Sequence, residues 1–148
     1  MIKLSIRDKM TASRLLDEYY LDIDSECVYA FPNRTGDDVC SKINGAVAEA
    51  LFELGFKGLK LMNGPVNLDE EAYDPEYNQT TDRLYHTWIV SGGKRYDFAD
   101  NVFHTEDGKS VSITEYDRDG EAEPIRAVYG DTKLKESVKK LLSSKIKR

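Results

Sequence analysis

Hydrophobic positions recur at steps of three and four residues between about Val39 and Leu54. The apolar stripe consists of Cys40, Ile43, Val47, Leu51 and Leu54. This spacing is typical of the buried face of an α-helix, and a glycine such as Gly55 commonly ends one. Asp37 or Asp38 precedes the first turn and is expected to cap it.

Two further segments have helical patterns. Residues 9–21 contain a rough apolar stripe, and residues 132–146 form an amphipathic segment near the end of the chain. Between the first two predicted helices, residues 27–31 are interpreted either as a short strand or as an extended lead-in that ends at Pro32.

The middle of the chain has the pattern of strands. Residues 57–63 suit a strand, whereas the polar and acidic residues 66–83 predict a long loop. A loop of this length in a compact domain is often a functional lid or binding loop. A second strand pair is expected around residues 110–116 and 125–129, which a polar turn connects.

A hairpin is predicted from residues 84–90 and 94–98, because Gly92 and Gly93 form a favoured two-residue turn. Helices therefore come first and antiparallel strands follow. This order predicts an α+β fold in which N-terminal helices pack on an antiparallel sheet. The length suits a single domain over residues 1–148 with a hydrophobic core of its own.

The net charge of −6 does not favour a nucleic acid as the main partner. The charge is unevenly distributed, because residues 131–148 contain seven Lys or Arg against Asp131 and Glu136, a net +5. We interpret this segment as a solvated basic helix whose cations suit its negative end. Docking of this helix to an acidic partner is the alternative.

The two cysteines, Cys27 and Cys40, lie outside any CxxC motif or zinc-ligand spacing, so no metal and no cofactor are expected. Residues 1–8 lack the apolar core of a signal peptide, and no apolar run approaches the ~18 residues that cross a bilayer. We expect a soluble cytoplasmic protein with free thiols and no membrane partner. Export by another route stays open, as does the oligomeric state.

Three residues along the chain form a workable set for thiol chemistry: Cys40, His86 and Asp97. With Gly92 and Gly93 as the turn, side-chain alternation places His86 and Asp97 on the same face of the hairpin. Cys40 lies at a helix start, where the partial positive charge lowers the pKa of a thiol. The set predicts a nucleophile, a base and a group that orients the base.

Each of these residues also has an ordinary structural interpretation. A cysteine on an apolar helix stripe, such as Cys40, is usually a small buried hydrophobe, and His86 alone would be a satisfied sheet histidine. Cys27 is interpreted as structural because it lies in an apolar stretch. The hypothesis of acyl transfer or amide cleavage depends on the coincidence of three positions.

The segment from His86 to Asp97, His-Thr-Trp-Ile-Val-Ser-Gly-Gly-Lys-Arg-Tyr-Asp, resembles a segment of transglutaminase-like members of the papain-like cysteine peptidase superfamily. The Cys40 helix with its Leu-Gly end at 54–55 resembles their cysteine helix, and the order Cys, His, Asp is the same. The resemblance covers about residues 33–103. It implies a papain/transglutaminase-like core with Cys40 as nucleophile, His86 as base and Asp97 as orienter.

The resemblance also suggests accessory residues. Papain-like enzymes often use a side-chain amide upstream of the cysteine to stabilise the oxyanion, and Asn33 lies seven residues before Cys40. The alternative for Asn33 is a turn residue beside Pro32. Trp88 is expected on the same face as His86, where it either walls the site or belongs to the core.

The predicted loop at 66–83 is our candidate for substrate recognition. Its candidate residues are Asp69, Glu70, Glu71, Tyr73 and Asp74. We expect this loop to border the site and to favour a basic peptide or protein substrate, although a solvated connector is the alternative. Hydrolysis, deamidation and acyl transfer all remain open.

A non-catalytic protein-binding module with the same fold is the alternative function. Ser41, which stands beside Cys40 where the family often has an aromatic residue or glycine, permits it.

Overall fold

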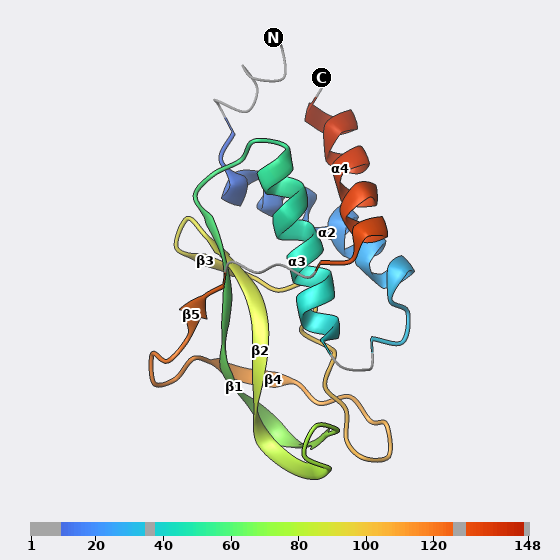
Figure 1. Cartoon of the computed structure of the whole chain (residues 1–148), viewed down its shortest axis with the longest axis vertical. Helices are drawn as coiled ribbons and strands as arrows, with labels where there is room; N and C mark the ends of the chain where they lie inside the picture. The colour runs from blue at the N-terminus through green and yellow to red at the C-terminus, as the bar shows by residue number, and fades with distance from the viewer. Residues whose placement is uncertain (1–9, 35–37, 126–129, 147–148) are drawn as a thin grey trace.

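The computed structural model describes residues 10–34, 38–125 and 130–146. This part of the chain forms an α+β fold of three helices and a five-stranded antiparallel sheet, and this fold class confirms the prediction (Figure 1). The helices are α2 (Ala12–Ala30), α3 (Val39–Glu53) and α4 (Thr132–Ile146). The strands are β1 (Leu59–Asp74), β2 (Gln79–Ser91), β3 (Lys94–Tyr96), β4 (Ile113–Tyr116) and β5 (Glu123–Pro124).

The sheet order is β3-β2-β1-β4, and β5 also pairs with β1. The helices gather at one end of the molecule, and the long β1–β2 hairpin extends away from them (Figure 1). The main core lies where the helices meet the sheet, and α3 is central to it: Ile43, Val47 and Leu51 are fully buried, as the predicted stripe requires. Each such side chain contributes about 1.5–3 kcal/mol of stabilisation by leaving water.

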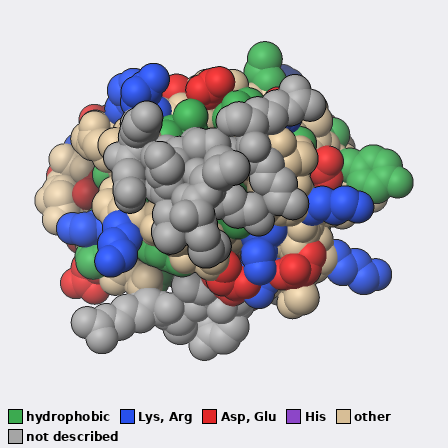
Figure 2. Space-filling model, turned by 90° about the horizontal axis from the view of Figure 1, so that it is seen from above, with side chains coloured by type: hydrophobic (Ala, Val, Ile, Leu, Met, Phe, Trp, Pro, Cys, Tyr) green, Lys and Arg blue, Asp and Glu red, His purple; other side chains and the backbone are tan. Residues whose placement is uncertain are grey.

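Helix α4 covers α3 and supports its position. Its buried residues at four-residue steps are Leu134, Val138 and Leu142. On the rim, Lys135 Nζ and Lys139 Nζ lie 2.9 Å and 2.8 Å from carboxylate oxygens of Glu53. Part of the basic C-terminal segment therefore faces acidic side chains of this same chain. Seen from the helical end, Figure 2 shows cationic and anionic side chains interspersed on the described surface.

Both interpretations of residues 27–31, a short strand and an extended lead-in, are wrong. Helix α2 continues to Ala30, with an interruption at Tyr19 (φ −110°, ψ 20°). Ile23 and Cys27 are four residues apart and fully buried, so they extend the apolar stripe of the helix. Packing on the core prevails over the local β propensity of this segment. The helix begins after Thr11, whose Oγ1 accepts a hydrogen bond from the Arg14 amide.

The loop predicted at 66–83 is also wrong, because β1 runs to Asp74 and β2 begins at Gln79. The register of the two strands shifts between Asn67 and Ala72. The strand is hard to recognise in the sequence because the charged side chains of Asp69, Glu70 and Glu71 are exposed. The apolar residues Val66, Leu68 and Ala72 are buried in a second, smaller cluster. Polarity on an exposed strand face resembles the polarity of a loop.

Of the strand pair expected at 110–116 and 125–129, the first strand is present as β4, and most of the second falls on residues that the structure does not describe. Strands β4 and β5 both pair with β1, where Val66 lies opposite Tyr116 and Met62 opposite Pro124. Residues 126–129 lie outside the described residues. Gly64 allows this arrangement, because a Cβ there would lie 2.5 Å from the Cβ of Ala122.

The segment before α4 crosses α3 in close contact. The amide of Asp131 donates to the carbonyl of Lys42 at 3.1 Å, and a Cβ on Gly130 would lie 2.4 Å from the backbone nitrogen of Ala46. Real Cβ contacts are essentially never this short, so an alanine at 130 requires the backbone to move. The absence of a side chain at Gly130 fixes the distance between α3 and the start of α4.

Gly130→Ala should lower the free energy of unfolding by about 3 kcal/mol, at the upper end of overpacking costs, because the atoms it meets are backbone. Urea denaturation measures the change. Gly120→Ala is the control: its added Cβ meets nothing within 4 Å, so only the φ of +69° counts, at roughly 1–2 kcal/mol. A smaller cost for Gly130→Ala than for Gly120→Ala would contradict the close contact.

Candidate functional site

The turn between β2 and β3 is a two-residue loop, as predicted. Gly92 and Gly93 have φ of +58° and +75°, the left-handed conformation that a type I′ turn needs at both central positions. The strands therefore pair Ser91 with Lys94.

This register brings His86 and Asp97 together. Nε2 of His86 lies 2.7 Å from Oδ2 of Asp97, and both residues are buried. The predicted imidazole–carboxylate hydrogen bond is confirmed. Because a carboxylate only accepts, Nε2 carries a proton and donates it into this bond.

Cys40 is the second residue of α3 and is half-buried. Two contacts hold the first turns of α3 against β2: Ser41 Oγ lies 3.2 Å from Thr87 Oγ1, and Asn44 Nδ2 donates to the Thr87 carbonyl at 2.7 Å. Since Thr87 follows His86 in β2, these contacts place the Cys40 end of α3 beside the imidazole.

The two ring nitrogens of His86 differ in their hydrogen bonding, and Nδ1 is the one without a bond to Asp97. It is buried and has no hydrogen-bond partner among the described residues. Burial disfavours the imidazolium, but the hydrogen bond to Asp97 and the interaction with Cys40 outweigh it and raise the pKa of His86 to about 9. The imidazolium therefore prevails at neutral pH.

The pKa values of the two cysteine thiols are shifted in opposite directions. Burial raises the pKa of the Cys40 thiol, but the interaction with His86 outweighs burial, and the pKa falls below its usual value. Cys27 is buried without such a partner, and burial raises the pKa of its thiol to about 12. The arrangement favours a thiolate at Cys40 and a thiol at Cys27.

The predicted cap at Asp38 is wrong. Asp38 is the N-cap residue of α3, but its φ is +62° and its side chain makes no capping hydrogen bond. Asp37 lies outside the described residues. The first-turn amides of α3 are therefore not neutralised by an Asp38 carboxylate, so the partial positive charge of the helix start favours an anion at Cys40.

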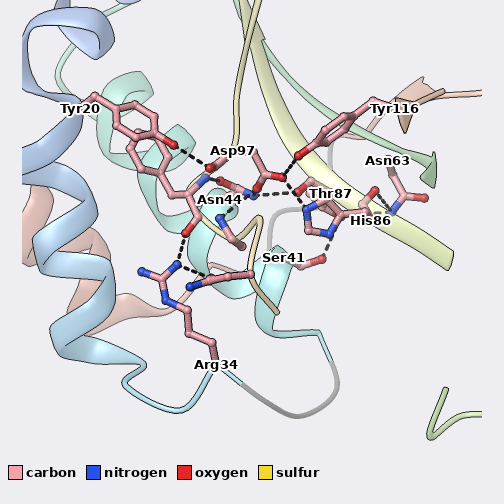
Figure 3. A network of polar contacts seen from close by, with 12 residues as sticks. Tyr20, Arg34, Ser41, Asn44, Asn63, His86, Thr87, Asp97 and Tyr116 are labelled. Carbon is pink, nitrogen blue, oxygen red and sulfur yellow. Dashed lines mark hydrogen bonds and ion pairs between the residues drawn. The ribbon is translucent and has the colours of Figure 1, made fainter. Parts of the chain in front are cut away.

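The Asp97 carboxylate accepts four hydrogen bonds, three of them from side chains (Figure 3). Oδ2 accepts from His86 and, at 2.5 Å, from the hydroxyl of Tyr116. Oδ1 accepts from Asn44 Nδ2 and from the Ala99 amide, both at 2.9 Å. Burial raises the pKa of Asp97, but the bonds from His86, Tyr116 and Asn44 outweigh it and hold the pKa below its usual range.

Asn44 and Tyr116 are site residues that the sequence hypothesis missed. Asn44 had a signal, because it stands four residues after Cys40 and interrupts an apolar helix face with an amide. Tyr116 had none, since its approach to Asp97 depends on the pairing of β4 with β1.

Aromatic rings surround the imidazole. The ring centroid of Trp88 lies 6.3 Å from that of His86 and 5.2 Å from that of Tyr116, and Phe103 lies 5.3 Å from His86. Trp88 is buried in the smaller cluster, so it is both a wall of the site and a core residue. These rings exclude water from the hydrogen bond between His86 and Asp97.

A surface depression of about 310 Å³ lies beside the Asp97 end of the cluster. Its lining includes Tyr116, Arg95, Asp100 and Asn101, but neither Cys40 nor His86. The guanidinium of Arg95 lies 3.6 Å from the centre of the Tyr116 ring.

The remaining candidates are not brought to Cys40 and His86. Asn33 is exposed after α2 and makes no hydrogen bond to the cluster in the described part of the chain. The acidic candidates lie beyond Gly64, which pairs with His86, on the part of β1 where the register shifts between Asn67 and Ala72, and the Tyr73 amide donates to the His104 carbonyl at 2.9 Å. The acidic candidates Asp69, Glu70, Glu71, Tyr73 and Asp74 therefore belong to the projecting hairpin rather than to a loop over the site.

The described residues contain no group of three or more His, Cys, Asp or Glu side chains that could hold a metal ion. None of the helices in the described ranges has the length and apolar character needed to cross a membrane. No family model, no curated protein and no solved structure matches this chain. The geometry of the Cys40, His86 and Asp97 cluster is therefore the basis for assigning a function.

Asp97→Asn should lower the pKa of His86 from about 9 to below the ordinary 6.5, because burial still disfavours the imidazolium while the carboxylate charge is lost. NMR titration of the imidazole resonances measures this shift. An unchanged pKa of His86 would contradict the coupling.

Proposed function

We propose that this protein is a cysteine enzyme of papain/transglutaminase-like type that acts on an amide or acyl bond of a peptide or protein. The observation that carries the proposal is the state of His86: Nε2 is fixed by Asp97, and the buried Nδ1 is left without a hydrogen-bond partner in the described chain beside a thiol of lowered pKa. A nucleophile, a base and an orienter need this arrangement.

The order of elements also supports the proposal. The helix that carries Cys40 is followed by β1, by β2 with His86, and by β3, after which Asp97 follows directly. The resemblance noted in the sequence implies the same order. This support concerns the arrangement of the site and leaves the substrate open.

The chemistry begins from a Cys40 thiolate and a His86 imidazolium. Sγ attacks the carbonyl carbon, and the carbonyl electron pair moves to oxygen. When the pair returns, the bond from carbon to the leaving group breaks, and His86 Nδ1 gives its proton to that group. A thioester on Cys40 remains.

The second half of the reaction regenerates the thiolate. Water or an amine attacks the thioester while His86 Nδ1 takes its proton, and the C–S bond breaks. Hydrolysis, deamidation and transfer differ only in the leaving group and in this second nucleophile. The backbone amide of Cys40, at the start of α3, is the proposed donor to the oxyanion, because Asn33 is exposed.

A protein-binding module that retains the arrangement without catalysis is the second candidate. The observation that favours it is the complete burial of His86, which limits access to the imidazole. The two candidates differ in what they require of Cys40, since only the enzyme needs a reactive thiolate.

At pH 7, iodoacetamide should label Cys40 at least tenfold faster than Cys27, because the thiolate is the reactive form. Intact-mass and peptide mass spectrometry of the folded protein measure both rates. His86→Ala should slow the labelling of Cys40 by about tenfold or more while leaving Cys27 unchanged. Equal slow labelling of the two cysteines would contradict the proposed nucleophile and favour the binding module.

With p-nitrophenyl acetate, the enzyme should release p-nitrophenolate in a burst and retain one acetyl group on Cys40. Absorbance and intact-mass measurements follow the two products. Cys40→Ala should abolish the burst, whereas Cys27→Ala should not change it. Acetylation that persists in Cys40→Ala would exclude Cys40 as the acceptor.

A further inference from the structure

We infer that Asn44 is a positioning residue that fixes the Asp97–His86 pair relative to the helix that carries Cys40. This inference deepens the proposed function and rests on it for its chemical meaning. The hydrogen bonds that carry it are independent of any substrate.

Asn44 is fully buried, and its amide bonds to two separate segments of the chain (Figure 3). Nδ2 donates to the Thr87 carbonyl at 2.7 Å and to Asp97 Oδ1 at 2.9 Å. Oδ1 of Asn44 accepts from the Phe98 amide at 2.9 Å. Both amide hydrogens and the acceptor are used, so the side chain has one orientation that satisfies all three bonds.

These bonds join the three elements that carry the reactive residues. Asn44 lies on α3 one turn after Cys40, on the same helix face. Thr87 is the neighbour of His86 in β2, and Asp97 and Phe98 follow β3. The Asn44 amide therefore holds α3 on β2, together with the contact between Ser41 and Thr87, and also sets the direction of the carboxylate.

The two oxygens of Asp97 have separate partners because of this arrangement. Asn44 and the Ala99 amide occupy Oδ1, which leaves Oδ2 to His86 and Tyr116. A carboxylate that lost the Asn44 bond could rotate and weaken its contact with Nε2. Burial would then still disfavour the imidazolium, while the hydrogen bond to Asp97 that offsets burial would be weaker.

Asn44→Leu removes the amide at similar volume, and Asn44→Ser retains a small hydroxyl with less steric demand. In Asn44→Leu, the pKa of His86 should fall from about 9 by at least one unit, and alkylation of Cys40 at pH 7 should slow by tenfold or more. Asn44→Ser should lie between Asn44→Leu and wild type, and it supplies the measurement if the leucine variant does not fold. NMR titration of His86 and iodoacetamide rates over a pH series give the two readouts, with circular dichroism as the test of folding.

Asn63→Ala is the matched control. Asn63 also donates to this part of β2, to the His86 carbonyl at 3.2 Å and to Thr87 Oγ1 at 3.1 Å, but its amide does not reach Asp97. This variant should leave the pKa of His86 within half a unit of wild type. In an Asp97→Asn background, Asn44→Leu should cause no further fall, because its effect passes through the carboxylate.

An unchanged pKa of His86 in a folded Asn44 variant, an equal shift in Asn63→Ala, or full additivity with Asp97→Asn would each overturn the inference. The outcome is separate from that of the proposed function. If Cys40 forms no acyl product but the pKa shift follows this pattern, the positioning role stands and the enzyme proposal fails. If acylation occurs and the pKa does not respond, the reverse holds.

Discussion

A buried carboxylate is the constraint on which the site depends. An isolated charge in a protein interior is strongly unfavourable, so the negative charge of Asp97 requires donors on both oxygens. They come from β2, β4, α3 and the backbone at Ala99, and the four bonds tie these segments to one point. Because the buried carboxylate needs these hydrogen-bond donors, the segments that supply them must lie in one defined arrangement around it.

The pKa of the imidazole depends on this carboxylate, and the pKa of the thiol depends on the imidazole. Without Asp97, burial would leave His86 neutral and the Cys40 thiol protonated. With it, the pKa of His86 rises to about 9, and the interaction with His86 in turn lowers the pKa of Cys40, although the charge of Asp97 by itself opposes a thiolate there. Aromatic rings around His86 keep water away and strengthen these interactions.

The molecule divides into a helical end, where α3 is held between α4 and the sheet, and a projecting β1–β2 hairpin (Figure 1). The site lies where the two meet, since His86 stands in the part of β2 that α3 covers. In this position the candidate residues Cys40 and His86 adjoin the closely packed core. A rigid helix and a paired strand, rather than loops, therefore supply Cys40 and His86.

The sequence by itself determined the local geometry. Two glycines that tolerate positive φ set the hairpin register, and side-chain alternation then placed His86 and Asp97 on one face. The three-and-four periodicity set α3 with Cys40 at its start. Only the tertiary structure decided which distant groups surround Asp97, because the approach of Tyr116 depends on β4 pairing with β1. It also decided that α2 continues through Cys27 and that the acidic run is strand, since burial against distant residues overrides local propensity.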